Sequence, residues 1–225
     1  EIAAGVLIRD SIRWLVDKIK ALKDAAFGAA ENFQVLRVRL EGLMARQFMK
    51  ETADDTMTFN DALALAGPAA KELFRWIILL AAQTPFGPEE IANTFTLATS
   101  YGLMRENAVR LTEAIVDFSS GMGLSNVAMT RIIENFGQMI QQGKITGMEL
   151  RDLGRGAFVP ATDMMLKAAS AMGILGAEAG ITAQELNDFA RENGLDPVML
   201  LMEGFIDIVD TEFVGAGERM GETLK

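Results

Sequence analysis

The stretch "GKITGMELRDLGRGAFVP", residues 143–160, decides the fold, because part of it returns later in the chain. The phrase "ITGMELRDLGR" at residues 145–155 becomes "ITAQELNDFAR" at residues 181–191. Its glycines, basic side chains and acidic pair raise a choice between a binding site that is copied twice and a helix start that is used twice. The spacing of its Thr and Glu residues decides between the two.

Each copy of the repeat carries a Thr three residues before a Glu, namely Thr146 before Glu149 and Thr182 before Glu185. In a capping box, the Thr oxygen accepts a hydrogen bond from the backbone N–H three residues on, and the Glu side chain accepts one from the backbone N–H of the Thr. The Ile before each Thr and the Leu after each Glu have the spacing of a hydrophobic staple. The repeat therefore predicts two helix starts, with these four polar residues as structural caps.

Other helix starts are predicted by the same kind of evidence. Ser125 is expected to cap a helix that begins at Asn126, and Asp196 to cap a helix whose first residue is Pro197. Pro88 has the place of a first-turn proline, and the two acids after it suit the positive end of a helix dipole. These residues predict a series of short, capped helices.

Glycine and proline mark the predicted helix junctions. Gly102 and Gly143 stand where a residue in the left-handed conformation closes a helix. Gly156 is expected to allow a tight turn, and Pro160 to precede the helix that follows. We expect the apolar residues between them, Phe158 and Val159, to be buried, so that this turn is a pinned hinge between helical hairpins.

The N-terminal segment has a different pattern. Residues 2–48 carry apolar side chains at three-and-four spacing without a proline, which predicts one long helix or two helices end to end. A stripe this narrow is typical of a coiled coil or of an arm that lies on neighbouring chains. The excess of basic residues in this segment fits a solvated helix face.

Four parts follow from these patterns: a long helical arm at 1–49, an acidic linker at 50–60, a helical domain at 61–213 and a flexible tail at 214–225. No stretch alternates between apolar and polar residues for long enough to predict a strand. The predicted fold class is all-α, with a long N-terminal helix followed by a bundle of short capped helices.

Composition limits the chemistry of the chain. Its 225 residues carry a net charge of −10 and include neither Cys nor His, which excludes disulfides, cysteine zinc sites and nucleophilic devices that use His. The acidity argues against binding to nucleic acid. The carboxylates near the linker lack the spacing of a calcium loop, and "GMGLS" and "GRGAF" lack that of a phosphate loop. We therefore predict no catalytic residue, no metal and no cofactor.

Two features leave functional alternatives open. Glu149 and Asp152 offer a pair of carboxylates for acid–base work on a glycan, although helix-dipole complementation also explains them. Five methionines have the spacing of a core but also suit an adaptable groove for a partner helix: Met164, Met165, Met172, Met199 and Met202.

The ends of the chain and its hydropathy give two further expectations. The sequence starts at Glu1 rather than at Met, so we expect it to be a piece of a longer protein. Its longest apolar run, Trp76–Ala82, is much shorter than the roughly 20 residues that span a bilayer. We expect no membrane segment in this piece.

Three segments of the chain form a recognisable succession: "ENFQVLRVRLEGLM" (31–44), "ELFRWIILLAAQTPFGPEEIANTFTLATSYGL" (72–103) and "GKITGMELRDLGRGAFVPATDMM" (143–165). Together they resemble the tape measure proteins of long-tailed bacteriophages and related prophages. The combination of "QTPFGPEEI" with "GKITGMELRDL" is similar to the tape-measure domain near the N-terminal part of that family. The family usually has "AGVP" after the second motif, whereas this chain reads "GAFVP" and keeps the proline.

The resemblance implies a structural role. Tape measure proteins lie along the lumen of the tail tube, set the tail length as tube subunits assemble around them, and are expelled ahead of the DNA. The partners implied are further copies of the chain through its N-terminal helix, tail tube or tail tip proteins, and tail assembly chaperones. The places implied are the tail lumen or tail end of the virion, and the host cytoplasm during assembly. A soluble helical adaptor and a wall-degrading accessory module of a phage tail stay open as alternatives.

Overall fold

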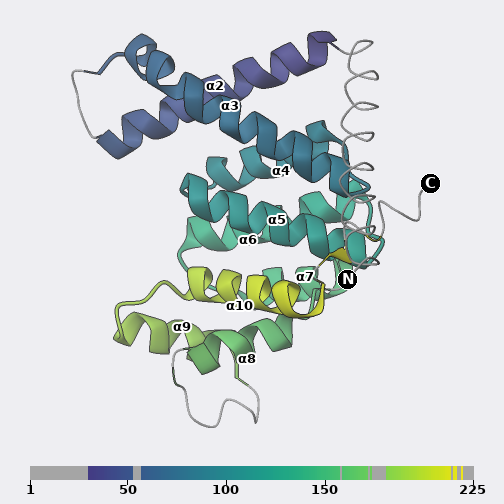
Figure 1. Ribbon diagram of the computed structural model, residues 1–225. Coiled ribbons are helices and arrows are strands. Elements are labelled where there is room, and N and C mark those ends of the chain that lie inside the picture. Colours follow the sequence, from purple (N-terminus) through teal and green to yellow (C-terminus); the bar gives the residue numbers. More distant parts are fainter. Residues whose placement is uncertain are drawn as a thin grey trace, which may run out of the picture. The chain divides into compact units, whose positions relative to one another are not determined.

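The computed structural model describes residues 30–52, 57–157, 159–171, 173, 181–213, 215–216 and 219. All regular structure within these ranges is helical, which confirms the predicted all-α class (Figure 1). The helices are α2 (Ala30–Thr52), α3 (Phe59–Gln83), α4 (Pro88–Ser100), α5 (Arg105–Gly121), α6 (Asn126–Gln142), α7 (Gly147–Gly156), α8 (Ala161–Ala171), α9 (Ala183–Glu192) and α10 (Pro197–Glu212).

The long N-terminal helix expected over residues 2–48 lies largely outside the described residues. Its described part is α2, which begins at Ala30 and continues to Thr52. α2 lies side by side with α3 (Figure 1). The coiled coil stays a prediction, and α2 itself pairs with a helix of the same chain.

The chain divides into two compact units, and the boundary between Ala92 and Asn93 falls within α4. In the first unit, α3 begins with a capping box that the sequence analysis missed. Thr58 Oγ1 accepts a hydrogen bond from Asp61 N at 3.3 Å, and Asp61 Oδ2 accepts one from Thr58 N at 3.1 Å. The stretch predicted as a linker therefore contains a helix start.

The core of the first unit is built from small side chains on α3 and larger ones on α2. Because the side chain of alanine is short, two helices can approach closely where alanines line the contact. The buried residues of both helices recur at helical spacing. The buried residues are Leu36, Leu40, Met44 and Ala45 on α2, with Ala62, Ala66, Ala69, Ala70, Leu73 and Ile77 among those on α3.

The second unit, which extends to Thr223, has an aromatic centre. Phe118 of α5, Phe136 of α6 and Phe205 of α10 are all buried. The ring centroid of Phe205 lies 5.6 Å from that of Phe118 and 5.6 Å from that of Phe136. Aromatic pairs at this distance add about 0.5–1.5 kcal/mol to the effect of burial alone. These rings hold α5, α6 and α10 together.

Two helical glycines allow close packing within the second unit. A Cβ atom on Gly204 would lie 2.6 Å from the carbonyl oxygen of Met164, so α10 approaches the backbone of α8 at this point. A Cβ atom on Gly137 would lie 2.0 Å from the ring of Tyr101, so that ring lies directly against α6. Neither position has room for a larger residue.

None of the described helices, including α3 with its apolar run Trp76–Ala82, combines the length and hydropathy that crossing a bilayer requires.

Candidate functional site

The second copy of the repeat forms a complete capping box at the start of α9. Thr182 Oγ1 accepts a hydrogen bond from Glu185 N at 3.2 Å, and Glu185 Oε2 accepts one from Thr182 N at 2.8 Å. The backbone hydrogen bond and then the hydroxyl of Thr182 lower the pKa of Glu185. The Glu185 carboxylate is therefore bound to its own helix start.

The first copy uses its acid differently. Thr146 Oγ1 accepts a hydrogen bond from Glu149 N at 3.4 Å, but the Glu149 side chain does not return to Thr146. Glu149 is 1% exposed, its Oε1 accepts from Gln142 Nε2 at 3.3 Å, and its Oε2 has no hydrogen-bond partner among the described residues. The complete box predicted here is corrected to half a box, because the buried carboxylate contacts the end of α6 instead.

Asn187 joins the two copies of the repeat. Its Nδ2 donates to Ile145 O at 2.7 Å, and its Oδ1 accepts from Ile145 N at 2.8 Å. Both hydrogen bonds are buried, so they satisfy the backbone of the residue that begins the first copy. Sequence reasoning missed this link. Its only signal is a side-chain amide at the position where the first copy has Arg151.

The other two caps accept backbone hydrogen bonds in the same way. Ser125 Oγ accepts from Ala128 N at 3.4 Å, at the start of α6. Asp196 Oδ1 accepts from two backbone N–H groups, at 2.9 and 3.2 Å, and Pro197 is the first residue of α10. Each of these hydrogen bonds joins residues of the same helix start.

Pro88 is the first residue of α4, and the acids that follow it lie in the first turn. Gly87 N donates to Glu90 Oε2 at 2.8 Å. The side chain of Glu90 thus makes the returning hydrogen bond of a capping box, which Glu149 does not make. Gly87 offers no side-chain oxygen to complete the box.

Two junction glycines have positive φ angles. Gly102, after α4, has φ of 106°. Gly143 has φ of 63° and ψ of 25°, and its N–H donates to Ile140 O at 3.1 Å. A residue with a side chain is strained at such angles, which explains glycine at both ends.

The third glycine junction differs from expectation. Gly156 is the last residue of α7 and does not have a positive φ, and the chain turns at Ala157, with φ of −128° and ψ of 3°. The predicted turn follows directly after Gly156, but it uses angles that any residue adopts and so does not require glycine. Pro160 O accepts from Met164 N at 3.0 Å, just before α8, and Val159 is buried. Phe158 lies outside the described residues.

The candidate chemical groups do not converge. Glu149 is buried whereas Asp152 is exposed, so the two do not form an open carboxylate pair. No group of three or more His, Cys, Asp or Glu side chains in the described part of the chain has an arrangement that could hold a metal ion. Met164 and Met202 are fully buried, Met165 and Met199 are half-buried, and Met172 is not described.

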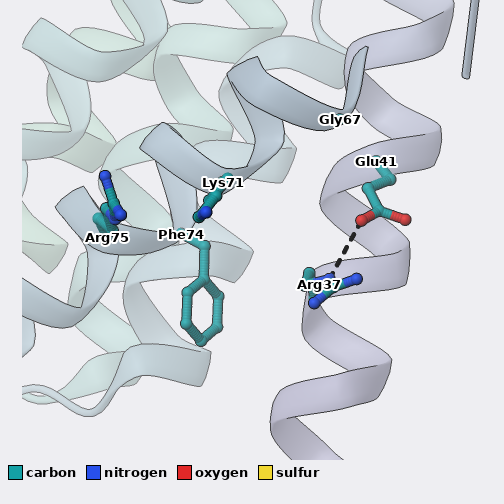
Figure 2. Close-up of a pocket in the computed structure, with 6 residues that line it drawn as sticks. All are labelled: Arg37, Glu41, Gly67, Lys71, Phe74 and Arg75. Atoms are coloured by element: carbon teal, nitrogen blue, oxygen red, sulfur yellow. Dashed lines mark hydrogen bonds and ion pairs between the residues drawn. The ribbon is translucent and has the colours of Figure 1, made fainter. Parts of the chain in front are cut away.

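A hollow of about 530 Å³ opens between α2 and α3 of the first unit. Figure 2 shows Arg37 and Glu41 on α2 across the hollow from the residues of α3, and Arg37 Nε donates to Glu41 Oε1 at 3.1 Å. Within the part of the chain that the structure describes, Lys71 and Arg75 have no ion-pair partner. The hollow is lined by Arg37, Glu41, Gly67, Lys71, Phe74 and Arg75.

Comparison with known proteins identifies a family. A family model described as "Tape measure protein" matches residues 46–196, which is more than half of the chain and includes both copies of the repeat. No curated protein and no solved structure matches. The family match confirms the resemblance that the sequence motifs show. The chain therefore belongs to the tape measure protein family, and its role is a structural one in the phage tail.

Proposed function

We propose that this chain is part of a tape measure protein that sets tail length, templates assembly of the tail tube and is expelled during genome ejection. The family match over residues 46–196 is the observation that supports this function. Helices suit a measuring role because an α-helix rises about 1.5 Å per residue, so the number of residues maps linearly onto distance.

The partners we propose follow from this role. Copies of the chain associate through the N-terminal helix, and the chain contacts tail tube or tail tip proteins and tail assembly chaperones. It meets the chaperones in the host cytoplasm during assembly and then occupies the tail lumen or the tail end of the virion.

We also propose that the chain acts without catalysis and without a cofactor. Its sequence has no His and no Cys. Thr182 and Gln142 bind the carboxylates of Glu185 and Glu149, respectively, through hydrogen bonds within the protein. Glu185 thus supports a helix start, and the Glu149 side chain contacts the end of α6.

Mass spectrometry of purified phage tests the role. The abundance of peptides from this chain is compared between intact particles and particles that have released their DNA. In a second experiment, the codons for this segment are deleted in frame from the phage gene, and the tails of that mutant are measured. We expect peptides of this chain in intact tails and a large loss of them after ejection. We expect the deletion to abolish tails of normal length.

Two results would contradict the proposal. One is retention of the peptides in emptied particles at their original abundance, which excludes expulsion. The other is a deletion mutant whose tails have normal length in electron micrographs, which excludes a part in measuring or templating the tail.

A further inference from the structure

We propose that the hollow between α2 and α3 binds the acidic face of α10 on a second copy of this chain. This contact goes beyond the tail role proposed above, and it uses surfaces other than the N-terminal helix. It rests on two features of opposite charge, one in each compact unit.

The first feature is the pair of cations on α3. Lys71 and Arg75 are four residues apart, so they lie on the same face of the helix, and both are exposed. No carboxylate in the described residues pairs with either of them. Arg37, on the α2 side of the hollow, is already paired with Glu41 (Figure 2). Within the described residues, the hollow therefore presents two positive charges that have no ion-pair partner.

The hollow also offers apolar surface. The half-buried ring of Phe74 lies between the two cations in the sequence and lines the same hollow (Figure 2). Gly67 leaves open space, since a Cβ atom there would meet nothing within 4 Å. A volume of about 530 Å³ is suited to side chains from a partner surface. This combination fits an acidic helix that also brings carbon atoms into contact.

The second feature is an acidic face on α10. Glu203, Asp207 and Asp210 follow each other at four and three residues, which places them on one face, and α10 contains no basic residue. Asp210 is exposed and has no ion-pair partner in the described part of its own chain. The acidic face therefore contains at least one carboxylate that is free to bind a cation from another copy.

The cations near this face do not cancel its charge. Glu203 accepts two hydrogen bonds from Arg110, at 2.6 and 2.7 Å, and Lys167 donates to Asp207. Even with these partners, the side chains of Glu203 and Asp207 are 43% and 56% exposed to solvent. The hydrogen bonds with Glu203, and then the charges of Glu203, Asp210 and Glu106, raise the pKa of Arg110. Among the described residues, Arg110 forms its ion pair with Glu203.

Charge complementarity selects a second copy as the occupant. The whole chain has a net charge of −10, so a pair of exposed cations attracts the carboxylate-rich surface of another copy. Because the hollow and the acidic face are different surfaces, a contact between copies joins them head to tail. Such a contact generates a ring if the rotation closes and an open chain if it does not.

Sedimentation of the whole chain, over a range of protein and salt concentrations, tests the proposal. We expect self-association that weakens as salt screens the charges. The variants Lys71→Glu and Asp210→Lys each place like charges opposite one another, and each is expected to weaken association about tenfold at low salt. Neither substitution breaks an ion pair within the described chain. Arg39→Glu, an equal charge change on an exposed residue of α2 outside the hollow, is the control and is expected to have little effect.

Mixing the two variants makes the test specific. In the mixture, the reversed hollow meets the reversed acidic face, and the unchanged hollow meets the unchanged face. We therefore expect an equimolar mixture to associate about as strongly as the original chain. Circular dichroism establishes that each variant is folded, and where a reversal unfolds the chain, Lys71→Gln and Asp210→Asn replace it.

Four results would overturn the proposal: a monomer at every concentration and salt, variants that associate as strongly as the original chain, an equal loss with Arg39→Glu, or a mixture that does not recover association. None of these results depends on tail length or on genome ejection. A failure of this contact is therefore distinguishable from a failure of the proposed function.

Discussion

Equivalent acids in the two copies of the repeat differ in their surroundings. Glu185 is exposed and accepts hydrogen bonds from Thr182, whereas Glu149 is 1% exposed and its Oε2 has no partner among the described residues. A buried polar group without a partner costs about 1–3 kcal/mol, and more when it is charged. The same residue type therefore stabilises one copy and carries a desolvation cost in the other.

Substitution of these two acids by Met is predicted to have opposite effects. Glu149→Met removes the buried carboxyl group with its unpartnered oxygen while keeping a similar volume, and we expect the free energy of unfolding to rise by about 1 kcal/mol. Glu185→Met removes half of a capping box, and we expect the free energy of unfolding to fall. Urea denaturation of the three proteins measures both changes. Shifts of the same sign would contradict this view of the repeat.

The lowered pKa of Glu185 predicts a dependence of stability on pH. The unfolded chain has the ordinary value of 4.5, and the hydrogen bonds from Thr182 lower the pKa in the folded chain. The stabilisation is therefore fully present above the unfolded pKa and is lost as pH falls through the folded pKa. We expect Glu185→Gln to lower the melting temperature at neutral pH but to have no effect in strong acid. A deficit that is equal at both pH values would contradict the prediction.

Asn187 gives a prediction for a buried polar link. Asn187→Leu leaves the N–H and C=O of Ile145 buried without partners, so we expect the free energy of unfolding to fall by about 2–3 kcal/mol. The neighbouring Asp188→Ala is the control. Among the described residues, Asp188 is paired with Arg191 at the surface, so its loss is expected to cost less than about 1 kcal/mol. Equal losses in denaturant titrations would show that the amide does not join the two copies.

At the scale of helices, short-range sequence patterns explain which features could be predicted. A cap such as Thr182 depends on a residue three positions away, and a helix end such as Gly143 depends on a single residue type that tolerates a positive φ. Both signals can therefore be recognised in a single sequence. The start of α3 was missed because Thr58 and Asp61 lie at the edge of an acidic, threonine-rich stretch that resembles a linker. The helix ends at Gly156, as the sequence predicts, but the turn itself falls on Ala157, which has no turn signal of its own in the sequence.

Close helix packing predicts opposite effects for two Gly→Ala substitutions. At Gly204 the new Cβ would lie 2.6 Å from the Met164 carbonyl, so α8 and α10 must separate, and we expect a loss of about 1–3 kcal/mol. At Gly42, in α2, the new Cβ meets nothing within 4 Å, and we expect a gain of up to about 1 kcal/mol from helix propensity. Thermal unfolding followed by circular dichroism compares the two variants. Similar effects at both sites would contradict the packing of α8 on α10.

At the scale of the whole molecule, sequence predicted the class and family but not the partners of each face. The apolar periodicity indicates which side of a helix is buried, yet it does not state which helix covers that side. The contact of Asn187 with Ile145 and the rings around Phe205 join residues far apart in the chain, so a single sequence contains no local signal for them. The pairing of α2 with α3 was missed for the same reason.

The family assignment and the helical fold together support a structural account of this chain. The match over residues 46–196 places it among the tape measure proteins, and the predicted caps form hydrogen bonds at helix starts, with Glu149 as the exception. The central proposal is that the length of the tape measure protein sets the length of the tail. The expected increase in tail length per residue follows from helix geometry, since each helical residue adds about 1.5 Å.

Tail length against inserted length is the most direct measurement of this proposal. In-frame helical insertions of graded length are placed in the phage gene that encodes this chain, and tails are measured in electron micrographs. We predict that tail length increases linearly, by about 1.5 Å for each inserted residue. Tails that keep their original length at every insertion would contradict the account.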